Sequence, residues 1–305
     1  MQESGGQDSS LRARPAGVYA ALGIGVIGLG FSAIFVRWAE APGIVSAAYR
    51  MGIAVALLAF PFLRSLGRIG KLSGPGIRWA VLGGLFFALD VGIWATGVML
   101  SGATNPTLVA NVAPVWVGLG ALFLFREKLN RTFWIGLLLA LCGAAVVLGL
   151  DSIRGFSLGL GTLLGLAASV FYALYYLATQ RGRETLDPLS YSWISGASSA
   201  ILLLLLAVLF GLPLTGFPAK SYLSFLAAGV VTQVLGYLAI NYALGHVPAS
   251  LVAPTLLGQP VATALLAGPL LGERLEPMQV LGGLGVLAGV FLVHRSKSGN
   301  KGGSK

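Results

Sequence analysis

Ten stretches of about 20 largely apolar residues account for most of this sequence. A stretch of that length can cross the hydrocarbon core of a membrane, about 30 Å thick, as one α-helix. Only 10% of all residues are charged, whereas soluble domains carry about a quarter. The sequence therefore predicts an all-α integral membrane protein with ten transmembrane helices. The predicted spans are 16–36, 44–63, 77–98, 103–124, 132–150, 157–179, 188–210, 221–244, 249–271 and 278–294.

The second half of the sequence repeats part of the first half at a fixed distance. Residues 103–147 return as residues 249–293, 146 positions later. This shift aligns Pro114 with Pro260, one Glu-basic-Leu triplet that begins at Glu127 with another, and two glycines with two others. A constant offset through all these matches indicates an internal duplication.

The duplication predicts that the two halves are inverted relative to each other. Each half holds five predicted spans, and an odd number makes the second copy enter the membrane from the opposite face. Inverted repeats are typical of secondary transporters. We expect a first five-helix repeat over 16–152 and a second over 153–294, between a disordered head, 1–15, and a basic tail, 295–305.

Lysine and arginine residues are distributed unevenly between the two sets of loops. If the N-terminus is cytoplasmic, that side holds fifteen of them and the other side four. Because cytoplasmic loops carry an excess of basic residues, both termini are predicted to lie in the cytoplasm, with the chain in the cell (inner) membrane. The net charge of +10 then reflects topology rather than nucleic-acid binding. Cys142 is the single cysteine, so no disulfide is expected.

Short motifs in both halves carry a family resemblance. They are residues 31–37 at the end of the first span, Ala48-Tyr49-Arg50 in the second, and the two copies of Pro…Glu-basic-Leu…Gly. With them, residues 16–294 resemble the drug/metabolite transporter superfamily in its EamA-type branch. The resemblance implies ten helices in two inverted halves around a cavity lined mainly by helices 1, 3, 4, 6, 8 and 9. It also implies transport, often outward, of amino acids, nucleobases, organic cations or other small metabolites.

Asp90 is an acidic residue near the middle of the third predicted span. A charge there costs at least about 2.5–3.5 kcal/mol, so the side chain should face the interior of the bundle. Trp94 lies one helical turn further on and shares its face. An acid beside an aromatic ring would suit a cationic or amine-bearing substrate.

Arg50 in the second span is a possible partner for Asp90. At about 1.5 Å of rise per residue, the two lie roughly 9 Å and 12 Å below the outer ends of their helices. A pair between them could be a fixed strut, a gate that breaks between states, or a clamp that a zwitterionic substrate opens. Direct binding of substrate or proton by Asp90 is the other interpretation.

Gln233, Tyr237 and Asn241 share one face of the eighth span, at a spacing of four. Buried amides without partners are costly, so this face needs either interhelical partners or a wet cavity. We favour the cavity because the resemblance places this helix there. Tyr172 and Tyr176 of the sixth span are weaker candidates, since an aromatic stripe also serves packing.

Pro114 and Pro260 lie deep in the fourth and ninth spans. A proline inside a helix removes one hydrogen bond and kinks the helix, and the freed carbonyls can line a cavity. Asn111 and Gln259 lie close to these kinks. Their amides could bond either the freed carbonyls or a ligand.

Glu127 and Glu273 stand just before the fifth and tenth spans, and we interpret them as structural. A carboxylate is favoured at a helix N-terminus, and the adjacent Lys128 or Arg274 can screen it. Glycines on one side of the fifth and tenth spans predict close helix packing. They are Gly136, Gly143, Gly149, Gly282, Gly285 and Gly289.

Together these features predict a secondary active transporter and not an enzyme. We interpret it as an exporter of small amino-bearing or amphipathic metabolites, such as amino acids, that works by alternating access. The sequence has no G-x-x-x-x-G-K-[ST] loop, so a proton gradient or exchange is expected in place of ATP. The expected partners are the lipid bilayer and a small-molecule substrate, without a cofactor, a metal or nucleic acid.

Two other functions stay open as alternatives. One is an intramembrane enzyme acting on a lipid-linked substrate, although Asp90 has no histidine at comparable depth and H-E-x-x-H is absent. The other is a passive channel, which a single asymmetric acid fits poorly, since channels use rings of charge.

Overall fold

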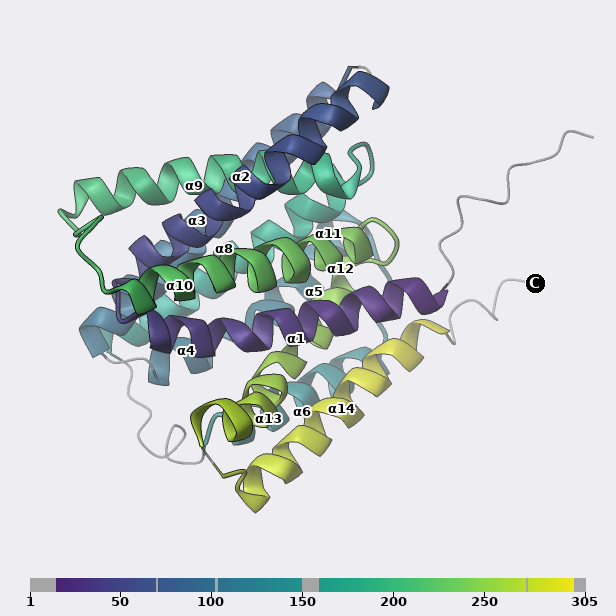
Figure 1. Ribbon diagram of the computed structural model, residues 1–305. Helices are drawn as coiled ribbons and strands as arrows, with labels where there is room; N and C mark the ends of the chain where they lie inside the picture. The colour runs from purple at the N-terminus through teal and green to yellow at the C-terminus, as the bar shows by residue number, and fades with distance from the viewer. Residues whose placement is uncertain (1–14, 70, 102–103, 150–158, 273, 299–305) are drawn as a thin grey trace, which may run out of the picture.

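The computed structural model describes residues 15–69, 71–101, 104–149, 159–272 and 274–298. These residues form helices and turns, and they contain no strand (Figure 1). The elements are α1 (Pro15–Ala39), α2 (Gly43–Ile69), α3 (Gly74–Ser101), α4 (Thr104–Ala110), α5 (Ala113–Leu124), α6 (Arg131–Val147), α8 (Leu160–Gly182), α9 (Pro188–Leu209), α10 (Ala219–Ala227), η2 (Ala228–Tyr237), α11 (Leu238–Leu244), α12 (Ala249–Thr255), η3 (Leu256–Gly258), α13 (Gln259–Leu271) and α14 (Pro277–Ser298).

The predicted all-α membrane fold is confirmed. Within the described ranges, nine helical segments are long and apolar enough to cross a membrane. The tenth, α6, has 17 residues, or about 26 Å of helix, which is close to the thickness of a hydrocarbon core. Several helices extend beyond the predicted boundaries, and α14 continues to Ser298. Most of the head and of the tail predicted to be disordered lies outside the described residues.

Local side chains and glycines set several helix ends. Asn130 caps α6 by accepting a hydrogen bond from the backbone N–H of Phe133, at 3.0 Å. Asp187 caps α9 in the same way through the N–H of Leu189, at 2.9 Å. After α13 the chain turns at Gly272, whose φ of 71° suits a glycine. Each device satisfies backbone groups that a helix end leaves without partners.

Three of the ten spans are not continuous α-helices. The fourth is broken between α4 and α5, and Pro114 lies in the first turn of α5. The ninth passes from α12 through the 3-10 turn η3 to α13, and Pro260 lies in the first turn of α13. A first-turn proline costs no helical hydrogen bond, so each break falls just before its proline. The eighth span contains a ten-residue π-helix, η2, which the sequence pattern does not indicate.

The contacts between spans follow the symmetry of two inverted five-helix repeats. Span three of the first half, α3, packs along α8, which is span one of the second half. In the mirrored contact, the segments α10, η2 and α11 pack along α1. Spans two, four and five meet their own counterparts, as α2 with α9, α5 with α12, and α6 with α14. Because the total of ten spans is even, α1 begins and α14 ends on the same side of the bundle (Figure 1).

Helices α6 and α14 approach each other at glycines, as the sequence predicts. A Cβ on Gly143 would lie 2.6 Å from the carbonyl oxygen of Gly282, and one on Gly136 would lie 2.8 Å from that of Gly289. Small residues let two backbones approach this closely. Gly149 follows α6 instead, with a φ of 107°.

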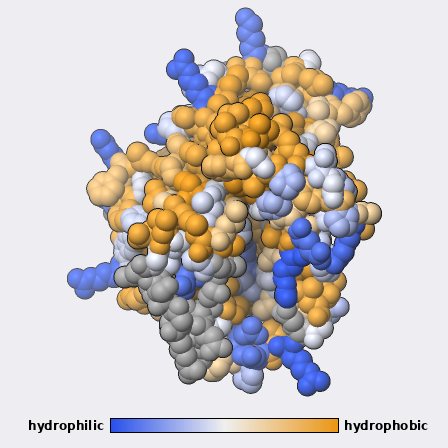
Figure 2. Space-filling view, turned by 90° about the vertical axis from the view of Figure 1, so that its left-hand side faces the viewer, coloured by the Kyte–Doolittle hydropathy of each residue, from blue (hydrophilic) through white to orange (hydrophobic). Residues whose placement is uncertain are grey.

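Large apolar side chains cover much of the outside of the bundle. Phe123, for example, is 80% exposed. Figure 2 looks onto the end of the bundle opposite the two chain ends, where hydrophilic side chains lie toward the edge. Along the helices themselves, exposed apolar side chains include Ile27, Leu138 and Leu284. Apolar surface of this extent is expected where lipid replaces water around the protein.

Candidate functional site

Arg50 projects from α2 into the buried core, and only 9% of the residue is exposed. Its Nη1 donates a hydrogen bond of 3.1 Å to Ser32 Oγ on α1. The guanidinium carbon lies 5.9 Å from the centre of the Phe87 ring on α3. Among the described residues, Arg50 Nε has no hydrogen-bond partner. This nitrogen can therefore donate to a ligand.

Asp90 lies half-buried on α3 and faces the same core. Its carboxylate interacts electrostatically with the Arg50 guanidinium. It also interacts with three tyrosine hydroxyls, those of Tyr172, Tyr176 and Tyr237. Between the described side chains of Asp90 and Arg50 there is no ion pair within 4.0 Å. Direct pairing of the two stays a prediction that concerns other conformations of the protein.

Aromatic rings from three spans form a wall beside these charges. The hydroxyls of Tyr172 on α8 and Tyr237 on η2 lie 3.2 Å apart. The ring of Phe87 meets that of Tyr237 nearly edge-on, with centres 5.2 Å apart. Tyr176 packs against Tyr172, and its buried hydroxyl has no partner in the described part of the chain. The wall therefore presents ring faces together with one unused hydroxyl.

Two amide side chains complete the group, and both belong to the predicted polar face of the eighth span. Asn241 accepts a hydrogen bond from the hydroxyl of Tyr175 at 3.1 Å and donates to Ser192 Oγ at 2.8 Å. Gln233 Nε2 lies 3.0 Å from the sulfur of Met51. The buried Oε1 of Gln233 has no partner among the described atoms. Asn241 is thus satisfied by other helices, whereas Gln233 retains an acceptor for a ligand.

A small cavity lies at one side of this cluster, next to the two amide side chains and the ring of Phe87. Its volume is about 30 Å³, comparable to the share of liquid volume that one water molecule takes. Sites for small-molecule ligands usually measure about 300–1,000 Å³. In this conformation the cavity is therefore too small to hold a metabolite. Gln233, Tyr237, Asn241, Phe87, Tyr175 and Ser192 are among the lining residues.

Three predicted site residues lie apart from this cluster. Trp94 Nε1 donates to Thr107 Oγ1 on α4 at 3.2 Å. Asn111 Nδ2 donates to the backbone oxygen of Thr107 at 2.8 Å, which is the local backbone bond expected near a kink. Gln259 is half-buried at the start of α13. Within the described ranges, no hydrogen bond or ring contact joins these three to the tyrosines, and their role as substrate contacts stays a prediction.

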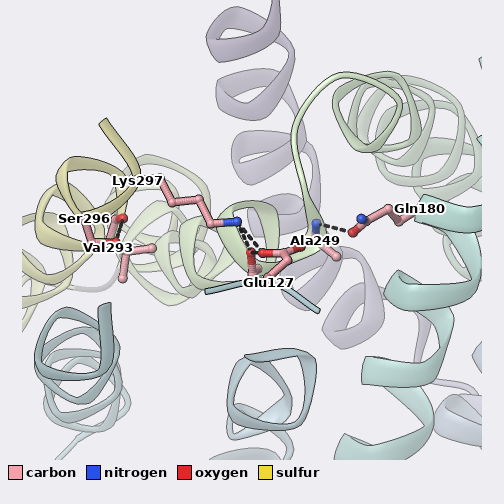
Figure 3. A network of polar contacts seen from close by, with 7 residues as sticks. Glu127, Gln180, Ala249, Val293, Ser296 and Lys297 are labelled. Carbon is pink, nitrogen blue, oxygen red and sulfur yellow. Dashed lines mark hydrogen bonds and ion pairs between the residues drawn. The ribbon is translucent and has the colours of Figure 1, made fainter. Parts of the chain in front are cut away.

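A polar network closes the side of the bundle that carries the chain ends (Figure 3). Lys297 near the end of α14 forms an ion pair with Glu127, which follows α5. Ser250 on α12 donates to Glu127 Oε2 at 2.6 Å and accepts from Lys297 Nζ at 2.7 Å. The N–H of Ala249 donates to Gln180 Oε1 on α8 at 2.6 Å. The partner of Glu127 therefore comes from the other half, rather than from the adjacent lysine, and Glu273 lies outside the described residues.

Arg183 adds hydrogen bonds between this network and the site. Its Nε donates to the backbone oxygen of Asn241 at 2.8 Å, and its Nη1 donates to the oxygen of Leu186. Burial lowers the pKa of the Arg183 guanidinium, and the charge of Asp187 opposes that shift. A Cβ on Gly245 would lie 2.3 Å from Arg183 Nη2, so a larger residue there would displace the guanidinium. The site is thus separated from the side of the chain ends by a layer of bonded residues.

Some residues of the site were absent from the sequence prediction of binding residues. Tyr175 shares the tyrosine stripe of α8, and Phe87 lies one turn before Asp90, so helical spacing could have indicated both. Ser192 and Met51 carry no such signal. They belong to the site because α2 packs against η2 and α9 packs against α11. Only the packing of the helices shows this.

The two inverted halves also appear in a comparison with known families. The model of the EamA-like transporter family matches residues 16–149 and again residues 159–295. The chain belongs to this family. It is therefore a multi-pass membrane transporter, and the resemblance stated from the sequence is confirmed.

Individual relatives of this EamA-like transporter are more distant. YyaM, an uncharacterized transporter of Bacillus subtilis (strain 168), is 24% identical over 257 residues, which cover 81% of this chain and 82% of YyaM. A probable amino-acid metabolite efflux pump of Salmonella typhimurium is 29% identical over 297 residues, 92% of this chain and 94% of the pump. One crystal structure matches with a TM-score of 0.75 at 19% identity, over 92% of this chain and 98% of that chain, and so shares the fold.

Proposed function

We propose that this EamA-like transporter is a secondary active exporter of small amino-bearing or amphipathic metabolites, with amino acids as the leading class. One observation carries the proposal. Three buried polar atoms of the central cluster have no partner among the described residues: Arg50 Nε, Tyr176 Oη and Gln233 Oε1, and of these three residues Gln233 lines the small cavity. An unpaired buried polar atom costs about 1–3 kcal/mol. A ligand that pairs with these atoms would recover part of that cost.

The chemistry of the site suits a zwitterion. The Arg50 guanidinium can hold a carboxylate, and the Asp90 carboxylate can hold an ammonium group. Phe87 and Tyr237 offer ring surfaces to an apolar side chain. We assign the binding role first to the residues in contact here and then to the outlying candidates Trp94, Asn111 and Gln259. The contact set is Arg50, Asp90, Tyr172, Tyr176, Gln233, Tyr237 and Asn241.

Alternating access supplies the mechanism, in which the two inverted halves rock against each other around the site. The excess of basic residues supports a cytoplasmic location for the side with the chain ends. On that side the ion pair of Glu127 with Lys297 joins the halves. Access from the cytoplasm requires that this ion pair opens. The helix breaks before Pro114 and Pro260 are suitable flexible points.

Export as the direction is supported by the Salmonella typhimurium relative, whose name describes an efflux pump. We assign to Asp90 the coupling of export to protons or to a counter-substrate. If protons drive export, neutralising Asp90 removes the pH dependence of transport. If exchange drives it, Asp90 serves binding alone.

Counterflow in proteoliposomes tests the proposal, because uptake driven by internal substrate requires a carrier. We expect labelled amino acid to accumulate against unlabelled amino acid inside, and we expect Asp90→Asn and Arg50→Gln each to slow it at least tenfold. Recovery of activity in the double swap Arg50→Asp with Asp90→Arg would identify a working pair. Lys220→Gln, which removes an exposed charge, is the control and should keep full activity.

A thermal-shift screen tests the substrate class independently. Amino acids, polyamines, nucleosides, organic cations and sugar phosphates are compared at equal concentration on the purified protein. Stabilisation by amino acids supports the proposal. Stabilisation by sugar phosphates alone would overturn it, since Arg50 is the only basic side chain of the described site that can hold a phosphate.

The enzyme alternative is tested in the same preparation. The sequence contains one G-x-S-x-G pattern, residues 155–159, with Ser157 at its centre. A nucleophile elbow of this kind stands on a strand-to-helix turn, and Ser157 lies outside the residues that the structure describes. We expect Ser157→Ala to transport normally, and hydrolysis of a lipid-linked substrate that this variant abolishes would favour the enzyme.

A further inference from the structure

An elongated groove runs along the outside of the bundle between α1 and α14, and it shares no lining residue with the cavity described above. Its volume is about 750 Å³, within the range of small-molecule sites. The segments α12, η3 and α13 pack against both helices and form its floor, to which Thr255 and Gly258 contribute. One wall comes from α1 and the other from α14, and both are mainly apolar.

The groove opens to the exterior at the depth of the membrane. Ile27 on α1 is half-exposed, and Leu287 and Phe291 on α14 are more than half-exposed. A Cβ on Gly23 would meet nothing within 4 Å, so the missing side chain leaves the wall of α1 open. An apolar groove that faces the bilayer can be filled from the bilayer without a solvent path.

The length of the groove corresponds to one leaflet. On α14 the lining runs from Val286 to Arg295, and on α1 from Tyr19 to Ile27. At about 1.5 Å per residue these distances are roughly 14 Å and 12 Å. One leaflet contributes about 15 Å of hydrocarbon. An extended acyl chain therefore matches the groove in length.

The end of the groove nearest the chain ends is polar and positive. Arg295 is exposed there, and Lys297 lies close enough to interact electrostatically with His294. His294 Nε2 lies 2.8 Å from Thr255 Oγ1, and its ring packs against that of Tyr19 at 5.6 Å. Tyrosine and basic residues are typical of the level of lipid headgroups.

We propose that this groove is a binding site for an anionic phospholipid, with an acyl chain between α1 and α14 and the phosphate at Arg295. Basic pockets between transmembrane helices bind anionic headgroups. The groove combines such a basic end with an apolar part long enough for an acyl chain. A second copy of the chain fits less well as the occupant, because its own net charge of +10 would meet the same positive end. The proposal does not depend on the transported substrate.

Native mass spectrometry and thermal shift on the delipidated, full-length protein in detergent test this site. Phosphatidylglycerol should remain bound and raise the melting temperature more than phosphatidylcholine does. Glycerol phosphate, which has the charge without the chains, should give no shift. Equal stabilisation by the two phospholipids, or a shift with glycerol phosphate alone, would overturn the proposal.

Two variants test the headgroup contact and the acyl-chain contact separately, each with a matched control. Arg295→Gln should lower the preference for phosphatidylglycerol about fivefold, while Arg68→Gln, an exposed arginine in the last turn of α2, should leave it unchanged.

Gly23→Leu should fill the groove and abolish retention of either lipid, while Gly52→Leu, where a Cβ also meets nothing, should not. Equal effects of a variant and its control contradict the site. A dimer that Gly23→Leu disrupts would identify a second copy as the occupant and contradict it too.

Discussion

The α6–α14 contact and the central site use the internal duplication in opposite ways. At the contact the two copies agree, since Gly136 and Gly143 align with Gly282 and Gly289. At the site the copies differ, because the same shift of 146 aligns Asp90 with Gly236 and Val91 with Tyr237. Shared residues therefore build the frame, and differing residues form the lining.

The aligned positions Asp90 and Gly236 show the physical consequence of this difference between the two copies. In the second half, Gly236 lets η2 pack closely on α1, since a Cβ on Gly236 would lie 3.0 Å from Leu29 Cδ1 and 3.5 Å from the backbone carbon of Gly28. In the first half, the same position places a carboxylate within electrostatic range of Arg50. One repeat position thus serves close packing in one half and charge in the other. A symmetric frame can then hold an asymmetric lining.

The largest effect should come from breaking the frame. In Gly143→Leu the new side chain would meet the oxygen of Gly282 and the nitrogen of Val286, each 2.6 Å from the Cβ. Overpacking of this kind against backbone should destabilise the protein by about 3 kcal/mol or more. Thermal unfolding in detergent measures the loss. Gly52→Leu is the matched control, and similar melting temperatures for the two variants would contradict the account of the frame.

A smaller effect should follow from opening the ion pair between the halves. Lys297→Gln leaves Glu127, whose side chain is 13% exposed, without its cation, at a cost of about 2 kcal/mol. The exposed pair of Lys220 with Glu40 should contribute less than about 1 kcal/mol. Chemical denaturation of Lys297→Gln and Lys220→Gln compares the losses of unfolding free energy in the two variants. Equal losses would mean that the network of Figure 3 does not hold the halves together.

The smallest expected effect concerns a single hydroxyl in the lining. Tyr237→Phe removes the contact with the Tyr172 hydroxyl and keeps the packing of the ring against Phe87. If the Tyr237 hydroxyl also bonds the substrate, that bond contributes about 1 kcal/mol, so KM for the substrate should rise about fivefold with only a small fall in melting temperature. Tyr222→Phe on α10 is the control. A large fall in melting temperature with unchanged KM would make this hydroxyl structural.

The sequence predicts the frame better than the lining. Helical spans follow from the length of apolar runs because lipid leaves the backbone no other partners, and the glycines of α6 and α14 lie on one side of regular helices. The lining depends on where helices cross. The partner of Glu127 lies 170 residues away, and the π-helical turn of η2 changes the helical spacing on which the prediction of its polar face rests. Neither can be derived from the pattern of one segment.

The asymmetric lining is the central claim, and one measurement tests it most directly. Counterflow is compared between Asp90→Asn and Glu273→Gln, at equal amounts of folded protein with matched melting temperatures. The account predicts that Asp90→Asn loses at least tenfold in rate, whereas Glu273→Gln, at a position where both copies carry glutamate, stays within about twofold of the wild type. Full activity in Asp90→Asn, or equal losses in both variants, would contradict it.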